Sequence, residues 1–268
     1  LRNMSQYMPR PDGTFRLLGL PGRGLVAARA TGGSYRIGVT ASKIEGMTKD
    51  GRYPTFFARE IQNAGAIQEI NPAAGTPSVT CDLVVDPGGT VQLSLVDGAG
   101  KPAGPCVVLF YPAPNTVMYG TAPDSTFVLK GLAPNESRHL WILQPQRRIG
   151  KVFFFHYDEK GASTLTVTLE PYATVKGRLL DEDGAPLKHV RLRTRGSTGS
   201  DPVVSDYQGE CDSDGRFVLR DLPPGCDYYT ILANSLKGKP RFATVAEKVV
   251  VAAGKTIDLG EIRLKREK

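Results

Sequence analysis

The apolar residues of this chain fall into short runs that alternate with turn signals. One phrase occurs three times, at 12–21, 124–132 and 214–225: an Asp-containing turn, then Phe, then apolar residues two and five positions after it. The Phe and the second residue after it share one face of a strand, because side chains alternate with a period of two. Pro follows the first and third phrases and ends a strand, since it cannot donate to a central ladder. We therefore expect a strand in each phrase.

A second pattern occurs twice, at 90–110 and at 174–193. Each copy reads as a strand, an Asp/Gly/Pro turn and another strand, which predicts a β-hairpin. Each hairpin precedes its Phe phrase, and apolar strands close the repeats at 165–169 and at 249–251, the latter followed by 257–262. The unit is about 85 to 95 residues of short strands at regular spacing, which is typical of a small β-sandwich.

These repeats divide the chain into three modules, residues 1–86, 87–171 and 172–268. The first module has a Phe phrase but no hairpin before it, so we expect its opening strands to be missing or to lie upstream, and the chain to be part of a longer protein. Linkers of about two to four residues between β modules indicate a semi-rigid rod. Helical periodicity is nearly absent, and the one short candidate is 56–63.

The third module resembles the carboxypeptidase regulatory-like domain, through the segment at 175–186, the Asp-Gly turn at 212–217 and the Leu-Pro-Pro-Gly at 222–225. The second module departs from that pattern, with Asp124-Ser125 in place of Asp-Gly and Ala133-Pro134-Asn135 in place of Pro-Pro-Gly. The resemblance implies an all-β chain, a tandem array of prealbumin-like (transthyretin-like) sandwiches of about seven strands each. It also implies a bacterial extracytoplasmic protein, whether periplasmic, cell-surface or secreted. These motifs are turn chemistry, so they indicate fold more strongly than function.

The net charge of +7 and the pI near 9.2 are spread along the chain, and the densest basic cluster is only 265–268. Nucleic-acid binding needs a concentrated basic face with stacking aromatics or a recognition helix, so we expect no nucleic-acid partner. Weak attraction to anionic envelope polymers is a simpler use of this charge. No run approaches the roughly 20 apolar residues of a membrane span. The chain opens without a signal-peptide pattern, and we expect the targeting signal to lie upstream.

The four cysteines contain no Cys-x-x-Cys pair, which argues against a zinc ribbon or a thioredoxin-type motif. They are Cys81, Cys106, Cys211 and Cys226. Cys211 and Cys226 flank one turn–strand–turn unit, so a disulfide between them is one hypothesis. Buried free thiols are the alternative.

No motif predicts a metal site or a cofactor. The turns that begin at Asp181 and Asp212 resemble the start of a calcium loop, but both lack oxygen ligands at the fifth and twelfth positions. The histidines, His139, His156 and His189, fall in separate phrases without a second ligand at metal spacing.

No motif predicts catalysis either. The chain has no Gly-x-Ser-x-Gly nucleophile elbow and no phosphate-binding loop, although a pair of sugar-cleaving carboxylates would leave no local signature. Related surface modules form Lys–Asn isopeptide bonds, and Lys176 lies in an opening strand, but the closing segment 258–262 offers no Asn. We expect the chain not to be an enzyme.

Aromatic residues are the best functional lead. Trp141 is the only tryptophan, and Phe154 and Tyr157 lie in an aromatic run at 153–157. Consecutive aromatics in a strand point to both faces, so one face is either exposed or covered by a neighbouring module. Core and inter-module packing is one interpretation. A sugar-stacking platform is the other, and Tyr228 in the third module raises the same question.

The sequence therefore favours a monomeric, non-catalytic structural or adhesive array. It would space or present another part of its chain and contact envelope material, either a polysaccharide or an envelope protein. One alternative is a carbohydrate-binding array, which exposed coplanar aromatics around Trp141 or Tyr228 would distinguish. Another is the extracytoplasmic sensing tail of a membrane-linked signalling protein, which a membrane span upstream of Leu1 would reveal.

Overall fold

A computed structural model describes residues 8–29, 35–36, 64–113, 116–198, 201–233 and 243–264. These residues form β-strands, turns and irregular segments, and they contain no helix that could cross a bilayer. The helix predicted at 56–63 lies outside the described residues. The chain divides into two compact units, and the second begins at Pro87.

In the first unit, β1 (Gly24–Ala28) and β2 (Ala66–Ile70) pair antiparallel. The strand predicted at 12–21 is wrong, because residues 14–20 adopt no regular structure and Leu18 is 84% exposed. In the second unit each Phe phrase pairs with the opening strand of its own module. The described part of the first unit contains no such opening strand, so this phrase has no ladder to join.

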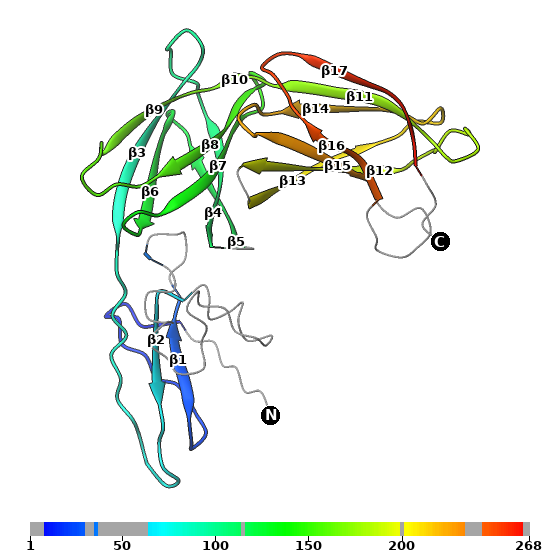
Figure 1. Cartoon of the computed structure of the whole chain (residues 1–268). Helices are drawn as coiled ribbons and strands as arrows, with labels where there is room; N and C mark the ends of the chain where they lie inside the picture. The colour runs from blue at the N-terminus through cyan, green and yellow to red at the C-terminus, as the bar shows by residue number, and fades with distance from the viewer. Residues whose placement is uncertain are drawn as a thin grey trace. The chain divides into compact units, whose positions relative to one another are not determined.

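The second unit contains two β-sandwiches (Figure 1). Sandwich I has one sheet in the order β6 (Thr126–Leu132), β3 (Gly89–Val96) and β9 (Thr164–Thr168). Its other sheet runs β10 (Glu170–Pro171), β8 (Ile149–His156), β7 (Ser137–Gln144), β4 (Cys106–Ala113) and β5 (Thr116–Ala122). Apolar side chains from both sheets, such as Leu93 and Ile142, form a single buried core between them.

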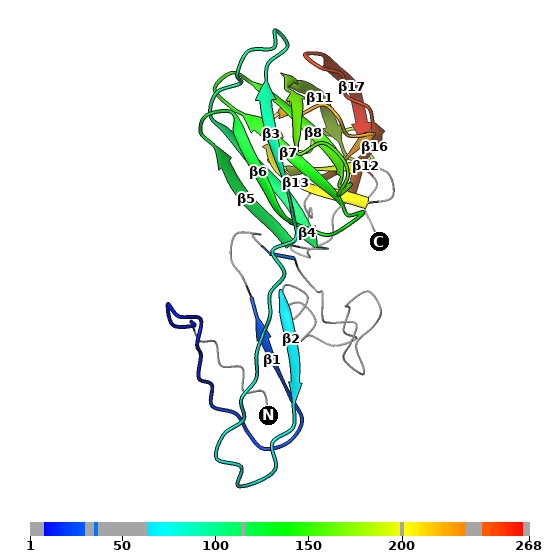
Figure 2. The same ribbon diagram turned by 90° about the vertical axis from the view of Figure 1, so that its left-hand side faces the viewer.

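Sandwich II repeats this arrangement. Its smaller sheet has the order β14 (Arg216–Leu222), β11 (Ala173–Leu180) and β17 (Thr256–Arg263). Its larger sheet runs β13 (Asp201–Glu210), β12 (Arg191–Thr198), β15 (Tyr228–Ala233) and β16 (Ala243–Val249). In both sandwiches the opening strand, β3 or β11, pairs antiparallel with the Phe strand and parallel with the closing strand. Figure 2 shows β3 beside β6 and β11 beside β17 from a second direction.

The two predicted hairpins are wrong in their pairing, although their turns form. The Oδ1 atom of Asp97 accepts from the backbone N–H groups of Ala99 and Lys101 at 2.9 and 3.0 Å. After this turn only the bridge between Val96 and Pro102 continues, and the chain then crosses to the other sheet as β4. Pro has no N–H to extend a ladder, which explains why pairing stops there. The turn at Asp181 leads from β11 to β12 in the same way.

Candidate functional site

The candidate site is the seam, which we define as the contact between the outer face of β7–β8 in sandwich I and the end of sandwich II. Trp141 of β7 lies opposite Val152 of β8. Their neighbours Leu140 and Ile142 point into the core of sandwich I, so Trp141 must point outward. Trp141 is nevertheless only 2% exposed, because it and Val152 belong to the buried core cluster of sandwich II.

The indole ring of Trp141 fits against two features of sandwich II. It forms an edge-to-face pair with the ring of the fully buried Tyr229, with centroids 6.1 Å apart and an interplanar angle of 85°. Edge-to-face contacts of this kind are favoured by the charge distribution of aromatic rings. Gly196 leaves the space that the indole occupies, because a Cβ there would lie 3.0 Å from Trp141 and 2.6 Å from Sγ of Cys226.

The main chains of the two sandwiches also meet at the seam. The N–H of Val152 donates to the carbonyl of Pro224 at 2.8 Å. Gly225 follows with a φ of 110°, and a Cβ at this position would lie 2.1 Å from the carbonyl oxygen of Val152. Only glycine satisfies both the backbone conformation and the close approach.

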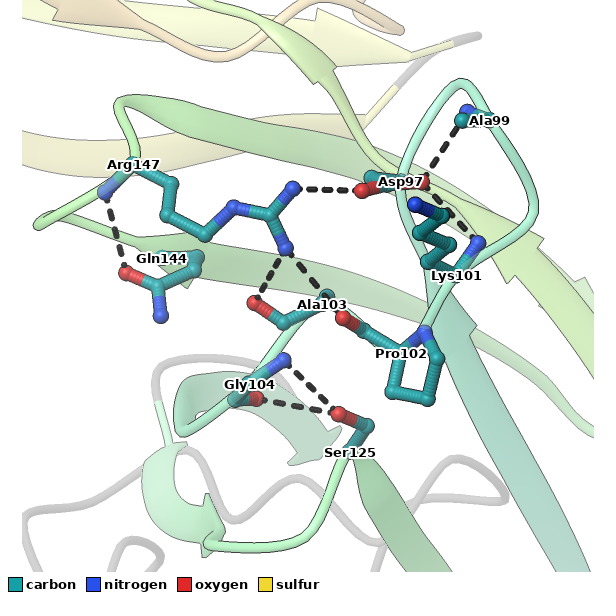
Figure 3. Close-up of polar contacts among 9 residues, drawn as sticks. All are labelled: Asp97, Ala99, Lys101, Pro102, Ala103, Gly104, Ser125, Gln144 and Arg147. Atoms are coloured by element: carbon teal, nitrogen blue, oxygen red, sulfur yellow. Dashed lines mark hydrogen bonds and ion pairs between the residues drawn. The ribbon is translucent and has the colours of Figure 1, made fainter.

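Two adjacent arginines in the β7–β8 turn bind to different sandwiches. Arg147 binds within sandwich I, where its guanidinium pairs with Asp97 and donates to the carbonyls of Pro102 and Ala103 at 3.2 and 3.0 Å (Figure 3). Arg148 instead pairs with Asp221 of sandwich II at 2.8 Å. The turn is thereby fastened to its own sandwich by one side chain and to the neighbouring sandwich by the next.

Further along the β7–β8 face, the seam ends in a polar contact and an exposed aromatic. Nδ1 of His139 and Oγ1 of Thr198 lie 2.5 Å apart and join β7 to the end of β12. The ring of Phe154 packs on His139 with centroids 4.9 Å apart, and Phe154 is 53% exposed. Beyond this contact, the outer face of β7–β8 is exposed to solvent instead of being covered by sandwich II.

The structure does not bring the four predicted ligand-binding aromatics together. Trp141 is buried, so it cannot stack on a sugar, and its placement corresponds to the inter-module packing interpretation. Phe154 lies on the same face but is exposed. Tyr157 is half-buried against the core of sandwich I, and Tyr228 is half-buried on β15, opposite Ser197.

Of the two hypotheses for Cys211 and Cys226, the structure corresponds to buried free thiols and not to a disulfide between them. The N–H of Cys211 bonds to Val190 near the start of β12, whereas Cys226 packs beside Gly196. The positions from Val190 to Gly196 span about 20 Å of strand, which no disulfide bridges. Burial raises the pKa of the Cys211 thiol to about 11 and that of the Cys226 thiol to about 12.

The remaining candidate groups serve local structure. The Oδ1 atom of Asp212 accepts from the N–H groups of Asp214 and Arg216 at 2.9 and 2.8 Å, so this carboxylate closes its own turn. Lys176 forms an ion pair with Asp258 at 3.1 Å on an exposed face. A backbone hydrogen bond from Gly260 and this lysine keep the pKa of Asp258 below its usual value, so the carboxyl stays anionic.

Sequence reasoning missed Gly196 and Gly225, the residues that make the seam close. A glycine inside a strand often marks a close approach of another backbone or ligand, so Gly196 within an otherwise regular strand was the available signal. The sequence pattern indicates only one role for Gly225, in the turn that follows the Phe strand. Its second role depends on Val152, which lies far away in the sequence.

No family model matches the chain, and no curated protein matches it. Similar solved structures are the TIE protein of Bacillus anthracis, a streptococcal ancillary pilin and the minor pilin of Streptococcus agalactiae. Their identities to this chain are 15%, 13% and 12%, and their TM-scores are 0.29, 0.27 and 0.30. The matches cover 78%, 72% and 66% of this chain, and 39%, 70% and 97% of those chains. These scores are too low to bear on function, and the all-β assignment rests on the strands described above.

Proposed function

We propose that this chain is a non-catalytic structural and adhesive β-sandwich array. It holds another part of its protein at a fixed geometry and contacts envelope material. The observation that carries the proposal is the seam, where Trp141 of sandwich I lies in the core of sandwich II. Truncating a buried aromatic of this size costs about 3–5 kcal/mol. Two sandwiches that share a core therefore behave as one rigid element.

The resemblance of the third module to carboxypeptidase regulatory-like domains supports an extracytoplasmic location. A spacer of this kind needs no second copy of itself, so we propose a monomer. The net charge of +7 supports contact with anionic envelope material, whether a polysaccharide or a protein. No cofactor enters this function.

Pulsed electron-spin distance measurements test the rigid coupling. Nitroxides are attached to Lys160→Cys in sandwich I and Lys188→Cys in sandwich II, with Cys81→Ser removing the one partly exposed native thiol. We expect one narrow distance distribution, because the seam fixes the two sandwiches. Adding Trp141→Ala is expected to broaden it.

A matched pair inside sandwich II, Lys188→Cys with Arg220→Cys, sets the width that a rigid body produces. A broad distribution between the sandwiches beside a narrow one for this control would overturn the proposal. An unchanged width in Trp141→Ala would show that the seam does not provide the rigidity.

A second function, carbohydrate binding, has one observation in its favour, which is the half-exposed ring of Phe154 packed on His139. An exposed aromatic face can stack on a sugar ring. Pull-down by insoluble polysaccharides that Phe154→Ala abolishes, with the melting temperature unchanged, would establish this function. Equal retention of the variant would exclude Phe154 as the platform.

A further inference from the structure

The strand β9 is the last strand of the smaller sheet of sandwich I, and it has a neighbour on one side only, which is β3 (Figure 1). The carbonyl of Ser163 and the N–H of Leu169, which flank β9, bond to β3 at 2.9 and 2.7 Å. The backbone groups of successive residues point to alternate sides of a strand. Those of Thr164, Thr166 and Thr168 therefore point away from β3 and form the outer edge of β9.

This outer edge is available for pairing. Thr164, Thr166 and Thr168 are all exposed. Across the described ranges of the chain, no strand pairs with this side of β9, and these three threonines form no hydrogen bond outside the β3–β9 ladder. Their N–H and C=O groups recur about every 6.7 Å along the strand. The edge thus presents a row of donors and acceptors that a further strand can use.

The corresponding strand of sandwich II, β17, has a protected edge. Its register with β11 shifts near Gly260, which has a φ of 66° and whose N–H donates to Oδ1 of Asp258 at 2.9 Å. Glu261 and Arg263 add exposed charges to the same strand. Natural sheets use such bulges and charges to prevent pairing at their edges. The sequence of β9, Thr-Leu-Thr-Val-Thr, has no charge, and its register with β3 has no shift.

The sheet face beside the edge of β9 is also uncharged. The outward-facing side chains of β9 and of the part of β3 that pairs with it are Thr164, Thr166, Thr168, Gln92, Ser94 and Val96. The equivalent face of sandwich II carries two ion pairs, Lys176 with Asp258 and Arg178 with Glu261. The two sandwiches share this architecture, so the difference lies in side-chain chemistry. A partner of β9 finds no charge to bind on this face.

An edge of this kind selects a peptide backbone. An extended chain offers N–H and C=O groups at the spacing of a strand, which a sugar polymer does not. Leu165 faces the opposite side of the sheet and is half-buried against the core of sandwich I, so an apolar residue of an added strand can cover it. A segment in which apolar residues alternate with uncharged polar residues therefore fits both faces.

We propose that the outer edge of β9 binds an extended segment of another envelope protein, which adds a fourth strand to this three-stranded sheet. The segment is uncharged, with hydroxyl or amide side chains beside Thr166 and apolar ones beside Leu165. Two copies of a chain with a net charge of +7 repel each other, so the strand comes from a different protein. The inference rests on the proposed adhesive function, since it names a protein strand as the material that the array contacts.

Amide hydrogen exchange of the whole chain, followed by nuclear magnetic resonance, tests this site. The probe is a peptide with the sequence of residues 90–96, the strand that already pairs with β9, and a lysine at each end. We expect the amides of Thr164, Thr166 and Thr168 to exchange rapidly in the free protein and at least about tenfold more slowly with the peptide. The amide of Thr256 on β17 is expected to be unaffected. Slowing at other edges without slowing at β9 would overturn the inference.

Variants of the edge test the same pairing. Thr166→Pro removes an outward N–H without removing a bond to β3, and it is expected to weaken peptide binding at least about tenfold. Thr166→Lys keeps the N–H, adds a charge to the edge, and is expected to weaken binding as well. The matched control, Thr256→Lys on β17, is expected to stay within about twofold of wild type. Melting temperatures confirm that each variant is folded.

Three outcomes would refute the site. Equal weakening by Thr166→Lys and Thr256→Lys would show that charge, and not the edge of β9, governs binding. Protection of Thr166 that rises with protein concentration in the absence of peptide would show that the edge pairs two copies of the chain. Absence of peptide binding with a narrow spin-label distance would refute this site and leave the spacer function standing.

Discussion

Trp141→Ala is the most direct test of the seam, and its cost can be worked out from the structure. A buried tryptophan removes about 200 Å² from water, which at about 25 cal/mol per Å² contributes about 5 kcal/mol. The edge contact with Tyr229 adds about 1 kcal/mol. The indole N–H has no partner among the described residues, and removing this buried donor returns about 2 kcal/mol. The expected loss in free energy of unfolding is about 4 kcal/mol.

Urea unfolding followed by circular dichroism measures this loss. In wild type the fluorescence of Trp141 provides a second probe, because it is the only tryptophan. Its emission is expected to be blue-shifted and insensitive to iodide in the native protein. Its unfolding transition is expected to coincide with that of the dichroism, since the ring lies in a core shared by both sandwiches.

Trp141→Phe is the control, because it keeps a ring and removes the unpaired N–H. We expect it to cost less than half as much as Trp141→Ala. A loss below about 1 kcal/mol in Trp141→Ala would refute the reasoning. Native emission that iodide quenches freely would also refute it, since the indole would then be exposed.

Two further predictions concern the seam and the thiols. Gly225→Ala should lower the melting temperature of the second unit far more than Gly100→Ala. Both glycines have a positive φ, but only at Gly225 would the added Cβ meet a carbonyl oxygen, at 2.1 Å. Equal losses in thermal melts would mean that backbone strain alone matters. Native Cys226 should resist alkylation at pH 8 while the half-buried Cys81 reacts. Burial raises the pKa of Cys226 from 9.0 to about 12, so the unfolded chain loses the thiol proton at a lower pH than the folded protein does. The free energy of unfolding should therefore fall as pH rises from 9.0 to about 12, and it should fall less in Cys226→Ala.

Local chemistry was sufficient to predict the opening, Phe and closing strands of the two sandwiches. It did not predict β5, β13 or β16, and the strand expected at 249–251 is wrong, because β16 ends at Val249. Phe127 and Phe217 begin strands whose alternate residues are buried, as the period of two requires. The turns at Asp97 and Asp181 also form as their side-chain chemistry indicates. Local chemistry could not predict which strands pair with one another. A turn reverses the direction of the chain, but it does not determine which sheet the next strand joins.

The seam was predictable only in outline. Consecutive aromatics near Trp141 indicated that one sheet face would be exposed or covered, and the covered interpretation agrees with the burial of Trp141. The residues that cover this face are set by the backbone hydrogen bond between Val152 and Pro224. No local sequence pattern predicts that long-range contact. The unpaired phrase at Phe15 shows the same limit, since a strand motif forms a strand only beside a partner.

The parallel pairing of the opening and closing strands has a mechanical consequence. In sandwich I the chain enters along β3 and leaves along β9, and in sandwich II it enters along β11 and leaves along β17. Because the paired strands point the same way, the entry and exit points lie at opposite ends of the sheet. Tension along the chain therefore loads all the hydrogen bonds between them in shear at once, instead of unzipping them one by one. Each sandwich is thus oriented to resist being pulled apart by its own ends.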